Sequence, residues 1–151
     1  MNTTEPPELG LTDEQIDEIR QLALGSLRET AEVDLPEGDK QILIVSEHKL
    51  VSSNFVESQA TGKVDSSAVL LLLGKAAPSS NPLLQQAYIT FMDDAGKLRR
   101  PAYSKKKGTI WLHMPLRMLP VVLAQIHETN VFCWIGHYAN GHIWGDIHTS
   151  H

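Results

Sequence analysis

The sequence predicts an α+β fold, in which helices pack against a mainly antiparallel sheet of about 5–6 strands. Three observations lead to this prediction. Several apolar runs have the length of strands, whereas only two segments repeat apolar residues at helical spacing. The strand-like runs follow one another through short polar connections and do not alternate regularly with helices, as they would around a parallel sheet. The chain also ends in a pattern typical of a β-hairpin.

Two helices are expected. The first covers residues 13–31, because Thr12 and Gln15 have the spacing of a capping box and apolar residues recur behind them at helical intervals. The second covers residues 116–128 and starts after Pro115, a residue that the first turn of a helix tolerates. Each helix has one apolar stripe, so both are expected to pack on the sheet.

The strands are less evenly defined along the chain. Residues 97–104 predict an edge strand or a broken one, because Pro101 cannot donate to a sheet ladder. Residues 47–66 have no clear period and fit either a strand with a loop or a short helix. The clearest predicted strands are 41–46, 68–73, 86–92 and 109–114.

Composition limits the class of protein. The chain has 151 residues, 42% of them apolar and 21% charged, which is ordinary for one globular domain. We expect a flexible arm over residues 1–11 and a single domain over 12–151. No apolar run has the length of a membrane helix, and the N-terminus has no secretory pattern. Cys133 is the only cysteine, which excludes an internal disulfide framework and favours a cytoplasmic location.

The C-terminal hairpin is predicted over residues 131–149. Asn140 and Gly141 separate two alternating segments, and both residues tolerate the positive φ of a two-residue type I′ turn. That turn places Cys133 opposite His148. The expected core face holds Phe132, Trp134, Tyr138, Ile143 and Ile147. The expected opposite face holds Cys133, Ile135, His137, His142, Trp144, Asp146 and His148.

This second face is the first candidate for chemistry. Directly opposed residues have Cβ atoms about 5 Å apart, so a thiol, an imidazole and a carboxylate would meet if Cys133, His148 and Asp146 share the face. Such a set has the logic of a thiol nucleophile, and with His137 or His142 it would also suit a divalent metal. The face equally fits a surface that is half-buried under a helix or against a partner. The chain lacks the P-loop, dinucleotide-binding, zincin and α/β-hydrolase motifs, and no cofactor is implied.

A basic strip is the second candidate. Between residues 97 and 107 lie six of the thirteen basic groups of a chain whose net charge is −5. Cations with an aromatic ring between them are typical of single-stranded nucleic-acid binding, although lysines also protect exposed sheet edges from aggregation. The candidate nucleic-acid-binding residues are Lys97, Arg99, Arg100, Tyr103, Lys105, Lys106 and Lys107.

Two tryptophans lead to the functional hypothesis. Trp111 and Trp144 alternate with apolar neighbours and are assigned to faces that do not form the core, where a large aromatic ring needs cover. Burial under a helix is the alternative. The candidate ligand or partner surface is Trp111, His113, His137, His142 and Trp144. We therefore expect a non-enzymatic binding module and homodimer, with the thiol or metal enzyme and the nucleic-acid binder as alternatives.

Overall fold

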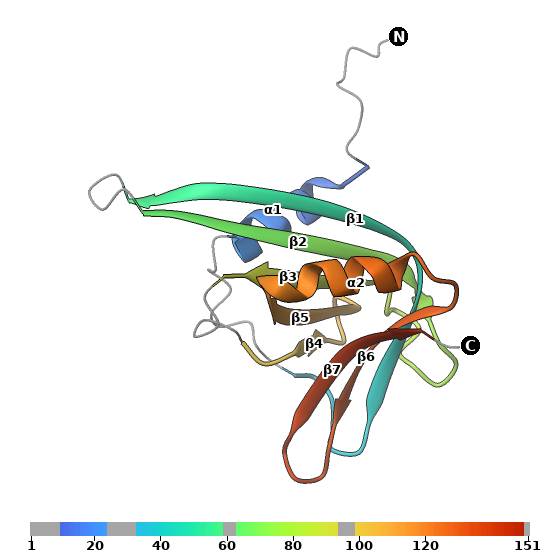
Figure 1. The fold of residues 1–151 in the computed structure, drawn as a ribbon. Helices are drawn as coiled ribbons and strands as arrows, with labels where there is room; N and C mark the ends of the chain where they lie inside the picture. Colours follow the sequence, from blue (N-terminus) through green and yellow to red (C-terminus); the bar gives the residue numbers. More distant parts are fainter. Residues whose placement is uncertain (1–9, 24–32, 59–62, 94–98, 150–151) are drawn as a thin grey trace.

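The computed structural model describes residues 10–23, 33–58, 63–93 and 99–149, with side chains for all of these except 53–58 and 63–66 (Figure 1). Most of the expected arm, the second half of the expected helix over 13–31 and Lys97 lie outside these ranges. The described chain combines helices with one strongly curled sheet (Figure 1), as the predicted α+β class requires.

The sheet has seven strands and is mixed, so the expectation of a mainly antiparallel sheet of five or six strands is corrected. The strands lie in the order β4-β5-β3-β2-β1-β6-β7. Their bounds are Lys40–Ser58 (β1), Lys63–Ala76 (β2), Gln86–Met92 (β3), Ala102–Ser104 (β4), Thr109–Pro115 (β5), Val131–His137 (β6) and Ile143–Thr149 (β7).

The segment without a clear predicted period belongs to β1 and β2, which are paired antiparallel over residues 47–58 and 63–66. A register shift between Val45 and Glu47 interrupts the alternation of β1. A bulge inserts one unpaired residue, so side chains beyond it change face and the sequence loses its period of two. This shift explains why the segment shows no readable pattern.

The parallel pair is β3 and β5, whose register aligns Tyr88 with Trp111 and Thr90 with His113. The short strand β4 pairs with β5 and not with β3, so that β5 lies between β4 and β3 in the sheet. β4 forms one edge of the sheet directly after Pro101, in agreement with the edge strand expected there.

The second helix is shorter than expected, whereas the prediction for residues 24–31 of the first helix lies outside the described residues. α1 (Asp13–Ala23) begins with the predicted capping box: the Gln15 backbone N–H donates to Thr12 Oγ1 at 3.1 Å, and the Thr12 N–H donates to Gln15 Oε1 at 3.0 Å. After β5, a 3-10 turn η2 (Leu116–Met118) leads into α2 (Leu119–Ile126). Within the described ranges, neither helix has the length and hydrophobicity of a membrane span.

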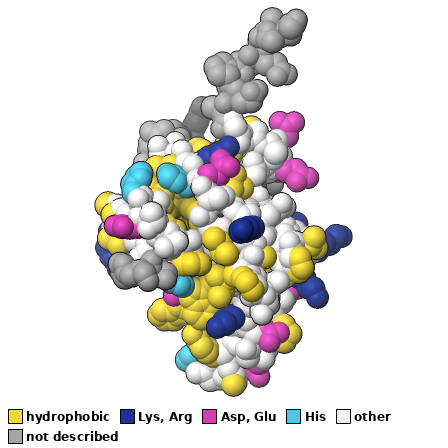
Figure 2. All heavy atoms as spheres, turned by 90° about the vertical axis from the view of Figure 1, so that its right-hand side faces the viewer, with side chains coloured by type: hydrophobic (Ala, Val, Ile, Leu, Met, Phe, Trp, Pro, Cys, Tyr) yellow, Lys and Arg dark blue, Asp and Glu magenta, His cyan; other side chains and the backbone are white. Residues whose placement is uncertain are grey.

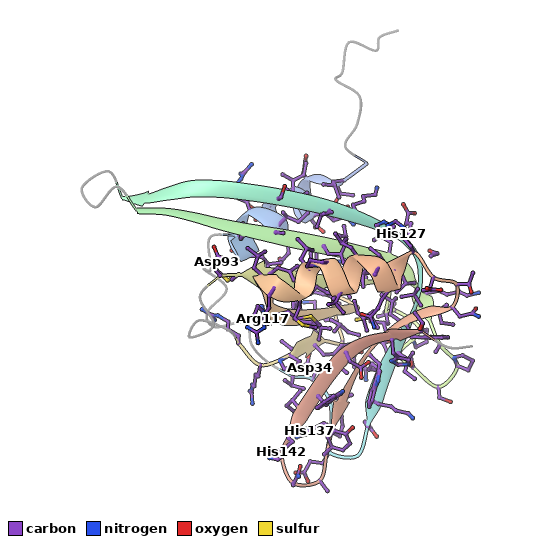
Figure 3. All side chains as sticks on the ribbon, in the orientation of Figure 1. Asp34, Asp93, Arg117, His127, His137 and His142 are labelled. Carbon is purple, nitrogen blue, oxygen red and sulfur yellow. The ribbon has the colours of Figure 1, made fainter. Side chains whose placement is uncertain are left out.

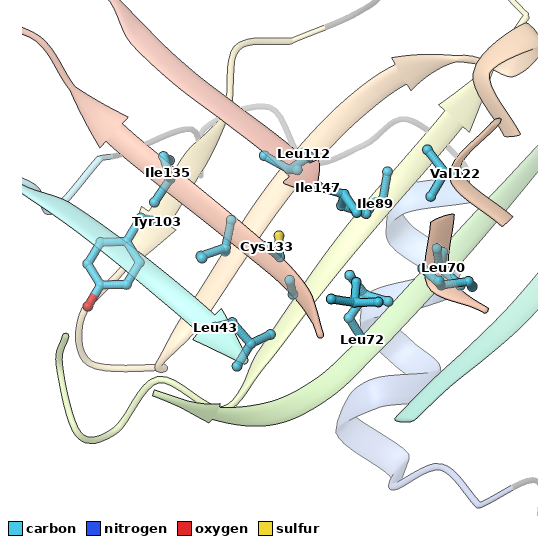
Figure 4. Close-up of a cluster of buried hydrophobic side chains, with 14 of the residues drawn as sticks. Leu43, Leu70, Leu72, Ile89, Tyr103, Leu112, Val122, Cys133, Ile135 and Ile147 are labelled. Atoms are coloured by element: carbon cyan, nitrogen blue, oxygen red, sulfur yellow. The ribbon is translucent and has the colours of Figure 1, made fainter. Parts of the chain in front are cut away.

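Two apolar clusters occupy opposite faces of the sheet. The inner cluster lies inside the curl, and it unites β6 and β7 with β3, β5 and α2 through residues such as Ile89, Leu112, Val122 and Ile135 (Figure 4). The outer cluster packs Ile19, Leu22 and Ala23 of α1 against β2, β3 and β5. Among the described residues, α1 therefore covers the outer face of one half of the sheet.

Candidate functional site

The loop of the C-terminal hairpin differs from the predicted turn by one residue. Tyr138 and His142 form the last pair, since the Tyr138 N–H donates to the His142 carbonyl at 2.9 Å. Gly141, with φ of 86°, donates back to the Tyr138 carbonyl, and Asn140 does not have a positive φ. The loop thus has three residues with glycine in the left-handed position, and the two-residue type I′ turn is wrong.

This difference moves Cys133 away from the proposed catalytic set. Cys133 pairs with Ile147, and both side chains lie in the inner cluster (Figure 4). Its burial, followed by the charge of Asp146, raises the pKa of the Cys133 thiol far above its ordinary value. Asp146 and His148 belong to the opposite face of the same hairpin, so the structure does not assemble a Cys133–His148–Asp146 site.

The predicted faces are correct for β7 and reversed for β6. Ile143 and Ile147 point inward as expected, but on β6 the inward side chains are those of Cys133 and Ile135. Phe132 and Trp134, which were assigned to the core, alternate with these and lie on the outside. We call the outward set the hairpin face: Phe132, Trp134, Trp144, Asp146 and His148.

One carboxylate organises the hairpin face. The Trp144 indole Nε1–H donates to Asp146 Oδ2 at 2.8 Å, and Asp146 Oδ1 lies 2.8 Å from His148 Nδ1. The His148 ring also stacks on Phe132, with ring centroids 5.6 Å apart. These contacts hold an imidazole and an indole in fixed positions, although the Trp144 side chain is exposed and keeps 55% of its surface open.

The hairpin face continues onto β1. Ile42 pairs with Trp134 and Ile44 with Phe132, and both isoleucines are only half-buried. Lys40 and Lys75 are exposed at register positions on the same side of the sheet. Figure 2 shows the molecule from the right-hand side of Figure 1, where hydrophobic side chains gather through the middle and lower part with single basic side chains, in dark blue, among them.

The remaining candidate histidines do not converge. The ring Nδ1 of His137 lies 2.6 Å from the Leu35 carbonyl, while His142 lies in the exposed loop beside Asn140. Both are near the tip of the hairpin, far from His127 at the end of α2 (Figure 3). His113 is on β5, where burial and then Arg99 lower its pKa to about 4. In the described part of the chain, no group of three His, Cys, Asp or Glu side chains has the spacing for a metal ion.

Trp111 corrects the expectation of an open surface on β5. The side chain is 5% exposed because α1 covers it, and its Nε1–H donates to Glu18 Oε2 at 2.9 Å. The alternative, burial under a helix, is therefore the correct one for this tryptophan.

The basic strip is divided in the structure. Tyr103 is buried and accepts a hydrogen bond from Asn81 Nδ2 at 2.9 Å, so its ring is not available to stack on a base. Lys105 and Lys106 line an open hollow of about 780 Å³ beside Asp34, whereas Lys107 lies over the Trp111 ring. Arg99 and Arg100 precede β4.

The comparisons with known proteins add no assignment. No family model matches the chain, and neither the curated proteins nor the solved structures contain a match.

Proposed function

We propose that the protein is a non-enzymatic interaction module, and that its hairpin face binds a second copy of the same chain. One observation supports this most directly: Trp144 is 55% exposed although its indole and the neighbouring Asp146 are held in fixed positions. Ordered, exposed tryptophans surrounded by other apolar side chains are typical of protein interfaces.

The chemistry of the surface favours a second copy as the occupant. A twofold interface presents the same patch on both sides, so the patch must be complementary to itself. The hairpin face and the adjoining β1 side chains combine apolar area with both signs of charge, from Lys40, Lys75 and Asp146. A twofold axis through the apolar part brings the lysines of one protomer toward the aspartate of the other.

The hairpin face is less well suited to catalysis. His148 contacts Asp146 and Phe132, and among the described residues it forms no hydrogen bond to a hydroxyl or thiol. A nucleophilic site needs such a group within about 3 Å of the base. The carboxylate is also shared with the Trp144 indole, which fits a rigid recognition surface.

The test is the mass in solution at micromolar concentration, measured by light scattering after size-exclusion chromatography. We expect a mass near twice that of the 16.8 kDa chain. Trp144→Glu places a second negative charge beside Asp146 within the proposed interface, so this variant should be monomeric. A wild-type protein that stays at the mass of one chain contradicts the proposal.

Leu83 provides a matched control. It is the most exposed large apolar side chain in the described residues, at 62%, and it lies outside the hairpin face. Leu83→Glu introduces the same charge at an exposed apolar site, so it should leave the dimer intact. If Leu83→Glu dissociates the protein as Trp144→Glu does, the interface is elsewhere and the proposal is wrong.

A further inference from the structure

A separate pocket lies on the half of the outer face that α1 covers. Its volume is about 380 Å³, near the lower end of the range for small-molecule sites. The walls come from α1, from β3 and β5, and from the loop before β5. The residues that give it its chemistry are Glu14, Asp17, Glu18, Tyr88, Lys107 and Trp111.

The pocket has an excess of negative charge. Glu14, Asp17 and Glu18 are three and four residues apart, so one side of α1 carries all three carboxylates toward the pocket. Among the residues that the structure describes, Lys107 is the only basic side chain that lines it. Three carboxylates against one ammonium group leave a formal charge of −2, which favours a cationic ligand.

Tyr88 gives an independent indication of a ligand. Its side chain is only 2% exposed, and its hydroxyl has no hydrogen-bond partner among the described residues, although it lines the pocket. Burial, followed by the charges of Glu18 and Glu14, raises the pKa of Tyr88, so the phenol stays neutral. The hydroxyl is reached from the pocket, so its oxygen can accept a hydrogen bond from a ligand that donates one.

The chain itself already places a cation at this pocket. Lys107 Nζ lies over the Trp111 ring, 5.8 Å from its centroid, in the geometry of a cation–π contact. The Trp111 ring is held by its hydrogen bond to Glu18. Two residues before Trp111 on β5, Thr109 Oγ1 accepts a hydrogen bond from Gln86 Nε2 at 3.0 Å. The pocket is therefore pre-formed, and its aromatic wall suits a positive charge.

We propose that this pocket binds a small aliphatic ammonium compound. The ammonium group donates up to three hydrogen bonds, which matches the Tyr88 hydroxyl and the carboxylates of Glu14 and Glu18. A divalent metal fits less well, because no three acidic side chains of the described residues converge at metal-ligand spacing. A ligand with two ammonium groups would pair with two of the three carboxylates that α1 directs toward the pocket.

The experiment is calorimetric titration of the full chain with 1,4-diaminobutane, with 1,4-butanediol as the uncharged probe of the same length. We expect saturable binding of the diamine and none of the diol. Tyr88→Phe removes only the hydroxyl and should weaken binding about fivefold, while Glu18→Gln should weaken it about tenfold. Equal binding of diamine and diol, no binding of either, or binding that neither variant changes would overturn the proposal.

Replacement of Lys107 should strengthen diamine binding, in contrast to the Tyr88 and Glu18 variants. Lys107→Ala removes the resident cation, so the diamine should bind at least threefold more tightly. Lys106→Ala removes the same charge from the same loop but lies outside the pocket, and its effect should be clearly smaller. If both variants act equally, the diamine responds to general charge and the pocket is not its site. Trp144→Glu should leave the titration unchanged, which separates this proposal from that of the hairpin face.

Discussion

Two tryptophans on the same side of one sheet have opposite environments. Trp111 on β5 is 5% exposed under α1, and its indole N–H is bonded to Glu18 of that helix. Trp144 on β7 is 55% exposed, and its indole N–H is bonded to Asp146 of its own strand. Each indole donates to a carboxylate. Glu18 belongs to the helix that covers Trp111, whereas Asp146 belongs to the same strand as Trp144 and does not cover its ring.

Under the proposed function, the difference divides the outer sheet face between folding and binding. α1 contributes an apolar stripe that includes Ile19 and Leu22, which packs on Val69 and Leu71 of β2. No second helix among the described residues does the same for β6 and β7, because α2 packs on the inner cluster. The half under α1 contributes to the stability of the monomer, whereas the half formed by β6 and β7, which no described helix covers, is the one that we propose as the interface.

Truncation of the two tryptophans gives the largest expected contrast. Trp111→Ala removes a buried ring and leaves a cavity under α1, so it should lower the free energy of unfolding by about 3–5 kcal/mol. Trp144→Ala removes an exposed ring, and its effect on a dilute monomer should be about 0.5 kcal/mol or less. Urea unfolding, followed at a concentration where the chain is monomeric, measures both. Equal losses would mean that Trp144 is covered within the monomer.

Acid gives the next largest effect, through His113 on the covered half. Burial and then Arg99 lower its pKa to about 4, below the ordinary value of 6.5. Between these two values the unfolded chain binds more protons, so stability must fall as the pH falls from about 6.5 to about 4. The expected loss is about 2 kcal/mol, less than the full shift implies because the side chain is only partly buried.

The measurement is urea unfolding of the wild type and of His113→Gln at pH 7 and at pH 4.5. A neutral glutamine does not titrate, so lowering the pH should destabilise the wild type more than the variant. A difference that stays constant between the two pH values would show that His113 is freely hydrated in the folded chain.

Local patterns predicted much of the fold. Thr12 and Gln15 predicted the cap of α1, and the alternation of Ile110, Trp111 and Leu112 predicted the two faces of β5. These predictions succeeded because hydrogen bonding at a helix start and alternation along a strand are both properties of neighbouring residues.

The features that failed depend on partners distant in sequence. The bulge after Val45 and the insertion of β5 beside β3 are settled by strand pairing, which the chain does not encode locally. In the hairpin, the loop contains Ala139 in addition to Asn140 and Gly141, and this reversed the assignment of β6, because a one-residue slip transfers every side chain to the other face. The spacing of Glu14, Asp17 and Glu18 is visible in the sequence. Only the fold shows that the three side chains line one pocket.

The smallest expected effect tests whether Cys133 and His148 lie on opposite faces of the hairpin. Cys133 is fully buried among apolar side chains, and its thiol is far from the thiolate form because burial raises its pKa. Alkylation of the native protein by iodoacetamide should therefore be slow at pH 7–8.5 and should become fast only in denaturant. His148→Ala changes the opposite face, so it should leave the native rate of alkylation unchanged. If instead the native thiol reacts quickly, and His148→Ala slows that reaction, then Cys133 and His148 share a face and the observed register of β6 and β7 is wrong.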